Sequence, residues 1–207
     1  MSRCVIIGGA PNGKYDRAKE ALRVDDFCIY CDSGLVHQAH LCAAPGLIVG
    51  DFDSHAKPES AVETIVLPRE KDDTDTMYAV KEGLRRGYKD FLLIGCSGKR
   101  LDHTLANLAI LLYLDTRGIP AKMLDDYSEM EIVSGREVEV PDTFSYFSLV
   151  NISGLARGVT ITGAKFPLRD AEITCDYAFA VSNEVLPGNK ARISLREGRL
   201  LLIKDVE

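Results

Sequence analysis

The sequence of 207 residues lacks tryptophan, an excess of basic residues and any long apolar run. Acidic side chains outnumber basic ones in both parts of the chain, 19 to 16 over residues 1–126 and 12 to 9 over residues 127–207, so neither part forms a basic arm for nucleic acid or an anionic membrane. Its apolar runs are too short to span a bilayer. The N-terminus carries only a short apolar stretch and no cleavage-site pattern. We therefore expect no signal peptide, and a cytoplasmic protein without nucleic-acid or membrane partners.

The composition is typical of a globular protein. Hydrophobic residues make up 46% and charged residues 27%, which supplies a core and excludes a disordered chain. We expect the cysteines to be reduced thiols, because no secretion signal accompanies them. Cys28-x2-Cys31 followed by His37-x2-His40 has a spacing similar to a zinc site. Residues three apart on a strand point to opposite faces, however, so zinc binding is not favoured.

The first 126 residues alternate short apolar segments with segments of helical period. Uniformly apolar strands separated by helices are typical of a parallel sheet covered on both faces. One helix is expected to begin after Thr74 as its N-cap. Another carries an apolar stripe made of Leu101, Leu105, Leu108 and Leu112. We expect strands at 4–8, 27–31, 46–49, 64–67, 91–94 and 121–124, and helices at 16–23, 35–42, 74–86 and 102–116.

The pattern changes after residue 126. Short segments rich in β-branched residues follow one another, separated by Gly, Pro, Asp and Asn, and no helical period appears. We therefore predict an α/β domain over residues 1–126 and an all-β sandwich domain over residues 127–207. Glu197-Gly198 is expected to form a hairpin turn between the last two strands. The expected strands are 130–133, 138–140, 146–150, 159–162, 191–195 and 200–203.

Aspartates concentrate in the loops that follow the predicted strands of the first domain. In an open parallel sheet, ligands bind outside the carboxyl ends of the strands. Carboxylates gathered there repel one another unless a cation neutralises them, and Mg²⁺ binds one or two carboxylates together with substrate phosphates. Capping of helix N-termini is the alternative for any single aspartate. The acids concerned are Asp32, Asp51, Asp53, Asp72, Asp73, Asp75 and Asp102.

Two further loops carry candidate phosphate contacts. Residues 8–15 are similar to a P-loop, but Tyr15 replaces the Ser or Thr that would hold Mg²⁺, and Pro11 removes an N–H group. We interpret this segment as a glycine-rich turn, which is either structural or part of a phosphate site. Lys99 and Arg100, in a glycine-containing loop before a helix, are better candidates for phosphate contacts.

Five motifs together resemble the thiamine pyrophosphokinase family (thiamine diphosphokinase) in its bacterial form. They span nearly the whole chain, and the second, third and fourth are highly specific in combination. The motifs are Cys-Asp-Ser-Gly at 31–34, Val-Gly-Asp-Phe-Asp-Ser at 49–54, Lys-Asp-Asp-Thr-Asp at 71–75, Gly-Lys-Arg-Leu-Asp-His-Thr-Leu-Ala-Asn at 98–107 and Val-Ser-Asn-Glu at 181–184.

The resemblance implies a Rossmann-like α/β domain that binds ATP and Mg²⁺, followed by a β-sandwich that binds thiamine. It also implies a homodimer, with active sites between the α/β domain of one subunit and the β domain of the other. Ser182 and Asn183 match the thiamine side. The implied metal ligands are Asp51, Asp53, Asp73 and Asp75. The implied ATP cleft contains Asp32, Thr74, Arg100 and Asp102, to which we add Lys99.

The resemblance implies that the thiamine hydroxyl attacks the β-phosphorus of ATP and that AMP leaves. Arg100 would stabilise charge, and either Asp73 or Asp102 would accept the proton. Asp73→Asn is expected to nearly abolish AMP release while leaving the fold intact. The alternatives are a Mg²⁺-dependent nucleotide phosphohydrolase and a non-catalytic nucleotide-binding module.

The sequence departs from the family pattern in two places. Ser33 stands where the family often has a second glycine. With no tryptophan in the chain, an aromatic contact to the pyrimidine ring of thiamine would need Tyr or Phe, such as Tyr177 or Phe179.

Overall fold

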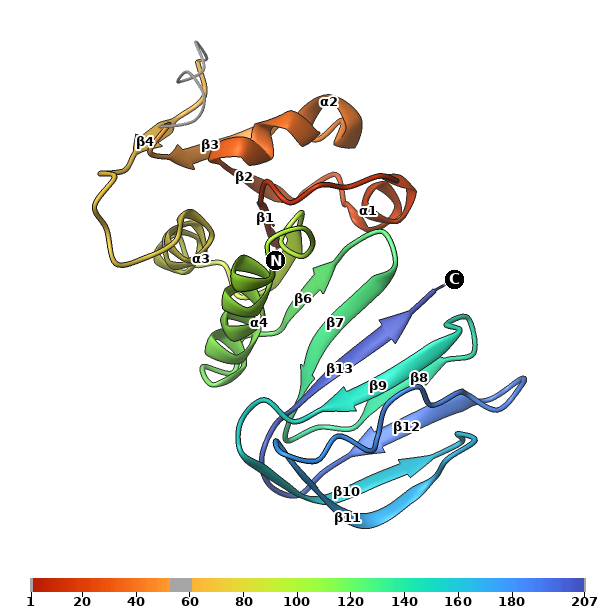
Figure 1. Cartoon of the computed structure of the whole chain (residues 1–207). Helices are drawn as coiled ribbons and strands as arrows, with labels where there is room; N and C mark the ends of the chain where they lie inside the picture. The colour runs from red at the N-terminus through yellow and green to blue at the C-terminus, as the bar shows by residue number, and fades with distance from the viewer. Residues whose placement is uncertain (1, 53–60, 207) are drawn as a thin grey trace. The chain divides into compact units, whose positions relative to one another are not determined.

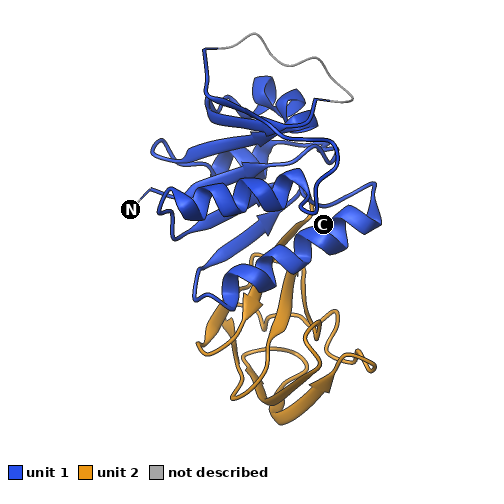
Figure 2. Cartoon of the chain, turned by 90° about the vertical axis from the view of Figure 1, so that its left-hand side faces the viewer, with its two compact units in different colours: residues 1–126 blue, residues 127–207 orange. Residues whose placement is uncertain are grey.

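The computed structural model describes residues 2–52 and 61–206, so Asp53 lies outside the described residues. The chain divides into two compact units, residues 1–126 (unit 1) and residues 127–207 (unit 2), which are coloured separately in Figure 2. Within the described ranges, no helix is both long and apolar enough to cross a membrane.

Unit 1 contains a parallel sheet with the strand order β4-β3-β2-β1-β5-β6 (Figure 1). Each neighbouring pair within this order is parallel, as the apolar strands and intervening helices predict. Along the chain, β2, β3 and β4 are added on one side of β1, and β5 and β6 are then added on its other side. In parallel sheets, such a change of side leaves a crevice at the carboxyl ends of the two central strands, here β1 and β5. The strands are β1 (Cys4–Ile7), β2 (Phe27–Cys31), β3 (Pro45–Gly50), β4 (Thr64–Val66), β5 (Phe91–Ile94) and β6 (Ala121–Leu124).

Helices cover both faces of this sheet. On one face, Val5 and Tyr30 pack in a cluster with Ala18 of α1 and Leu41 of α2. On the other face, α3 approaches closely at Gly83, where a Cβ atom would lie 2.8 Å from the Phe91 ring. The helical elements are α1 (Asp16–Ala21), the 3₁₀ helix η1 (Asp32–His37), α2 (Gln38–Leu41), α3 (Asp75–Arg85) and α4 (Leu101–Asp115).

Two features of the helices test the sequence prediction. Thr74 is the N-cap of α3, as expected, and its hydroxyl accepts a hydrogen bond from the Met77 N–H at 3.2 Å. The apolar stripe of Leu101, Leu105, Leu108 and Leu112 is not the buried face of α4, because Leu101 and Leu105 are exposed. The buried residues of this helix are Asn107, Ile110, Leu111 and Leu114. Because α4 is apolar on several sides, its periodicity does not select one face.

Unit 2 contains two antiparallel sheets, with the strand orders β7-β13-β9 and β11-β10-β12-β8. Side chains from both sheets, including Val133, Leu149, Ile161 and Ile193, share one core, which confirms the predicted sandwich. The strands are β7 (Ser128–Val133), β8 (Val138–Pro141), β9 (Tyr146–Val150), β10 (Leu155–Thr162), β11 (Leu168–Thr174), β12 (Lys190–Ser194) and β13 (Leu200–Asp205).

Two details of unit 2 correct the sequence prediction. Strand β11 was not expected, because its apolar alternation is interrupted at Asp170, whose φ is 53° and near which the register with β10 shifts. The hairpin predicted at Glu197-Gly198 is wrong. Strand β12 pairs with β8 and β10, whereas β13 pairs with β7 and β9, so the chain crosses between sheets at this turn.

Candidate functional site

A cavity of about 600 Å³ lies at the carboxyl ends of the strands of unit 1. This volume is within the usual range for small-molecule sites, and the place is where open parallel sheets bind ligands. The predicted residues Asp32, Asp51, Thr74, Asp75, Lys99 and Arg100 all line it. The other lining residues are Gly8, Gly9, Ala10, Pro11, Cys31, Ser33, Thr76, Gly95, Cys96, His103, Thr104 and Asn107.

Asp51 and Asp75 converge on one cation, the ammonium group of Lys71. Its Nζ lies 2.6 Å from Oδ2 of Asp51 and 3.0 Å from Oδ1 of Asp75. The side chains of Lys71 and Asp51 are only 16% and 15% exposed. Burial lowers the pKa of Lys71, but its hydrogen bonds with Asp51 and Asp75 outweigh this and raise the pKa overall. Lys71 is therefore positively charged when no metal ion is bound to Asp51 and Asp75.

The residues of the cavity fit a magnesium ion that is held jointly with phosphate. In the described part of the chain, no three Asp, Glu, His or Cys side chains gather as a metal cluster. Two carboxylates that share one small cation match the usual Mg²⁺ site, which takes one or two carboxylates and completes its coordination with water and phosphate. Asp53, the other expected ligand on this loop, lies outside the described residues.

Two predicted carboxylates are engaged elsewhere in this structure. Asp73 forms an ion pair with Lys81, whose Nζ is 2.6 Å from Oδ2, and Asp73 does not line the cavity. Asp102 pairs with Arg100 at 2.5 Å on the surface. The hydrogen bond from Arg100 lowers the pKa of Asp102 to about 2, which makes it a weak proton acceptor while the pair lasts. The roles of Asp73 and Asp102 stay predictions.

The backbone is strained where the strands meet the cavity. Asp32, directly after β2, has a φ of 40°, and Phe52, just after β3, has a φ of 52°. Residues other than glycine rarely adopt such angles, and they concentrate at functional sites. The two positive φ angles thus fall at Asp32, the first residue of η1, and next to Asp51, and both aspartates line the cavity.

Three further lining residues on α4, His103, Thr104 and Asn107, belong to the motif at 98–107 but have no site role assigned from the sequence. His103 and Asn107 are four residues apart and so share a face of the helix, a spacing that could have identified them together. Asn107 is buried, and its Nδ2 donates a hydrogen bond to the Cys96 carbonyl at 2.7 Å, which fixes the loop after β5. Burial raises the pKa of Cys96 to about 12. This thiol is therefore protonated and is not a nucleophile.

The glycine-rich segment that follows β1 borders the cavity through residues 8–11. Its far end is anchored by Asp126, whose Oδ2 accepts hydrogen bonds from the N–H groups of Gly13 at 2.5 Å and Lys14 at 2.9 Å. Gly9 lies directly against Ser33, because a Cβ atom on Gly9 would be 1.8 Å from the Ser33 hydroxyl oxygen. Ser33, which stands where the family often has a glycine, therefore leaves no room for a side chain at position 9.

This contact gives a testable prediction. Gly9→Ala is expected to destabilise the protein by about 1–3 kcal/mol, because the new methyl group overlaps Ser33. In the double variant with Ser33→Gly, much of that loss should be recovered, since the obstructing side chain is gone. Thermal unfolding of both single variants and the double variant measures the coupling. Strictly additive effects would contradict the predicted contact.

The residues predicted on the thiamine side lie in unit 2 and differ in accessibility. Ser182 is exposed and has a φ of 54°, and its main-chain N–H donates a hydrogen bond to Ser148 Oγ at 3.0 Å. Asn183 is buried. Its Oδ1 accepts from the Phe166 N–H at 3.0 Å, and its Nδ2 donates to the Phe166 carbonyl at 2.8 Å. In this structure Asn183 therefore fastens the segment around Phe166.

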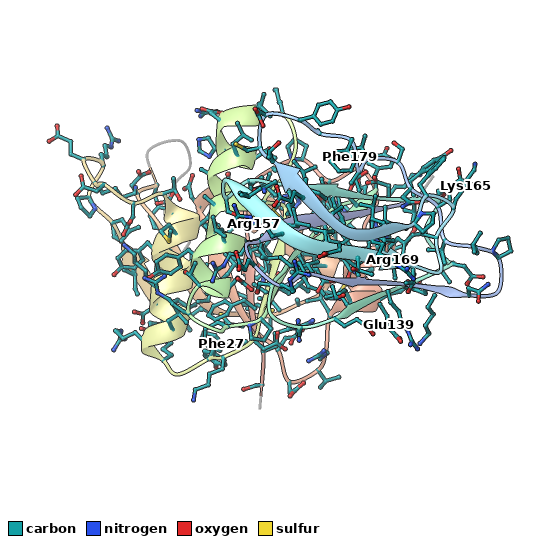
Figure 3. All side chains as sticks on the ribbon, turned by 90° about the horizontal axis from the view of Figure 1, so that it is seen from below. Phe27, Glu139, Arg157, Lys165, Arg169 and Phe179 are labelled. Carbon is teal, nitrogen blue, oxygen red and sulfur yellow. The ribbon has the colours of Figure 1, made fainter. Side chains whose placement is uncertain are left out.

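A small pocket of about 60 Å³ lies beside Asn183 and is lined by Phe166, Val181 and Phe179 among others. Phe179, labelled in Figure 3, is exposed, and its ring centroid is 5.6 Å from that of Tyr177, which is also exposed. An exposed aromatic pair beside an apolar pocket is suited to stacking on a flat ring. Both aromatic candidates named from the sequence are therefore in one place on unit 2.

Comparisons with known proteins match both units. Residues 18–123 match the model described as "Thiamin pyrophosphokinase, catalytic domain", and residues 135–200 match "Thiamin pyrophosphokinase, vitamin B1 binding domain". The chain is 27% identical over 215 residues to the thiamine pyrophosphokinase of Bacillus subtilis (strain 168), with all of both chains covered.

Solved structures agree in fold. The crystal structure of thiamine pyrophosphokinase from Bacillus subtilis has a TM-score of 0.89 at 23% identity, with both chains covered completely. That of the Geobacillus thermodenitrificans protein has a TM-score of 0.84 at 24% identity, covering 100% of this chain and 98% of the other. Because the catalytic-domain model alone matches half of the sequence and the vitamin B1 binding model follows it in order, the chain belongs to the thiamin pyrophosphokinase family.

Proposed function

We propose that the chain transfers the pyrophosphoryl group of ATP to the hydroxyl of thiamine and releases AMP and thiamine diphosphate. The observation that carries this proposal is the cavity of unit 1, where Asp51 and Asp75 lie with Lys99 and Arg100, in a chain that matches both domains of the family. Acidic and basic side chains in one cavity suit a metal-bound triphosphate.

We assign the residues of unit 1 to ATP and its metal. Asp51 and Asp75, joined by Asp53, would hold Mg²⁺, which when bound neutralises charge on the phosphates. Lys99 and Arg100 would contact phosphate oxygens, and the close turns at Gly8 and Gly9 let the backbone approach them. Thr74 and Asp32 would border the nucleotide.

The proposed reaction makes one bond and breaks one bond. The thiamine hydroxyl oxygen bonds to the β-phosphorus, and the bond from that phosphorus to the bridging α,β oxygen breaks, so the oxygen leaves with AMP. A carboxylate, Asp73 or Asp102, would take the hydroxyl proton. For Asp102, this requires that Arg100 first exchange its ion pair for a phosphate, because the pair holds the pKa near 2.

We assign thiamine to unit 2, with Ser182 and Asn183 beside the ring and Tyr177 or Phe179 stacked on it. The support is the match of residues 135–200 to the vitamin B1 binding model and the exposed aromatic pair. We further propose a homodimer. Leu101 and Leu105, exposed on α4, are side chains of the kind that a second copy would cover.

The test is a product assay on purified protein whose mass in solution is measured by light scattering. With ATP, Mg²⁺ and thiamine, we expect a dimer that forms AMP and thiamine diphosphate in equal amounts, and no turnover when EDTA is added. Phosphate or diphosphate released from ATP without thiamine would instead support the phosphohydrolase. Tight ATP binding with no turnover would support a binding module. Full activity from a monomer would exclude the dimer.

A further inference from the structure

Lys71 has no role in the proposed reaction, yet its side chain contacts both candidate metal ligands, Asp51 and Asp75. It lies in the loop between β4 and α3, Asp51 follows β3, and Asp75 opens α3. The ammonium group is within 3.0 Å of one oxygen from each carboxylate. It thus joins two residues of the cavity lining, Asp51 and Asp75, which come from separate segments of the chain.

A second observation concerns charge. The three side chains are mostly shielded from water, so Asp51 and Asp75 would repel each other strongly if neither had a counter-charge. An exposed lysine could move away from the two carboxylates at little cost in free energy. The side chain of Lys71, including its aliphatic part, is largely buried and is therefore held in place. The ammonium therefore stands in the position that a divalent cation shared by these two carboxylates would need.

We propose that Lys71 is a built-in counter-ion of the site, which positions Asp51 and Asp75 when no divalent cation is bound and competes with that cation for them. This proposal rests on the proposed function in taking the two aspartates as metal ligands. Lys71 is a positioning residue, because it acts through the carboxylates. Since a divalent ion must displace the ammonium, the chain alone binds the ion weakly, and nucleotide phosphate is needed for tight binding.

The test measures Mn²⁺ binding to nucleotide-free protein by electron paramagnetic resonance. Lys71→Met is expected to bind Mn²⁺ about tenfold more tightly than the wild type, because a competing charge next to both ligands is gone. Lys71→Arg, which keeps the charge, should stay within about threefold of the wild type. Lys190→Met is the matched control. It also removes one lysine charge, which pairs with Glu139, but it belongs to unit 2 and should leave binding unchanged.

Thermal unfolding in EDTA supplies a second measurement. Lys71→Met should unfold at a lower temperature than both the wild type and Lys71→Arg, and Mn²⁺ should restore it. Equal or weaker Mn²⁺ binding by Lys71→Met, or an unfolding midpoint unchanged in EDTA, would overturn the proposal. If Lys71→Met does not fold, Lys71→Gln replaces it. Neither measurement uses ATP or thiamine, so failure of the proposed reaction in the product assay would be seen separately.

Discussion

Asp51→Asn is expected to lower the rate of thiamine diphosphate formation about a thousandfold, equivalent to ~4 kcal/mol of transition-state stabilisation. Asp51 lines the cavity, and its carboxylate shares a cation with Asp75. An amide in its place keeps the shape of the side chain but loses its negative charge. Binding of Mg²⁺ and the ion pair with Lys71 both depend on that charge. AMP formation under saturating ATP and thiamine measures the effect.

Asp90→Asn is the matched control, because Asp90 precedes β5 and so lies at the opposite end of the sheet from the cavity, half-exposed beside Arg23. We expect it to keep activity within about twofold of the wild type. Both variants should retain the circular dichroism spectrum of the parent. If Asp51→Asn kept more than a tenth of the wild-type rate, Asp51 would not be a metal ligand of the reaction.

Asp73→Asn tests whether Asp73, one of the two carboxylates proposed as proton acceptors, takes part in the reaction. Asp73 pairs with Lys81 outside the cavity lining, so its part in the reaction requires that this pair open when substrates bind. Near loss of AMP release with an intact fold, as the sequence motif predicts, would place Asp73 in the reaction. Turnover like that of the wild type would leave Asp102 as the candidate.

Lys204→Met is expected to lower the free energy of unfolding by about 3–5 kcal/mol, the range found when one partner of a buried ion pair is removed. Lys204 Nζ lies 2.5 Å from Glu129 Oε1 and 2.7 Å from Glu131 Oε1. The side chains of Lys204 and Glu131 are 4% and 7% exposed. Methionine fills the space but removes the ammonium group that pairs with Glu131 in the interior of unit 2. Equilibrium unfolding in urea measures the loss.

Lys190→Met is again the control. In the wild type Lys190 forms an ion pair with Glu139 on the surface, and its side chain is 60% exposed. Figure 3 labels Glu139 together with Arg157 and Lys165, which form similar surface pairs with Glu172 and Glu184. Such pairs contribute at most about 1 kcal/mol. The double variant Lys204→Met/Glu131→Leu should recover part of the loss. A destabilisation below 1 kcal/mol for Lys204→Met would contradict the buried ion pair.

Much of the fold follows from the sequence because its signals are local. Apolar strands such as Phe27–Cys31 and Ala121–Leu124 have the bounds that the sequence predicted, and Thr74 caps α3 as expected. The motif order also identified the family, and most of the residues predicted for ATP line one cavity. The family follows from the resemblance of the motifs, whereas the fold and the place of the cavity follow from hydrophobic period, cap chemistry and the rule that ligands bind at the carboxyl ends of parallel strands.

The sequence by itself thus determined an α/β unit with aspartates at its strand ends, followed by a β-sandwich. Only the tertiary structure decided which face of α4 is buried, which sheet β12 joins, and which aspartates face the cavity. It also joined Lys71 to Asp51, twenty positions away in the sequence. Each of these depends on contacts between distant segments. Periodicity along one helix or strand carries no information about the partner that packs against it.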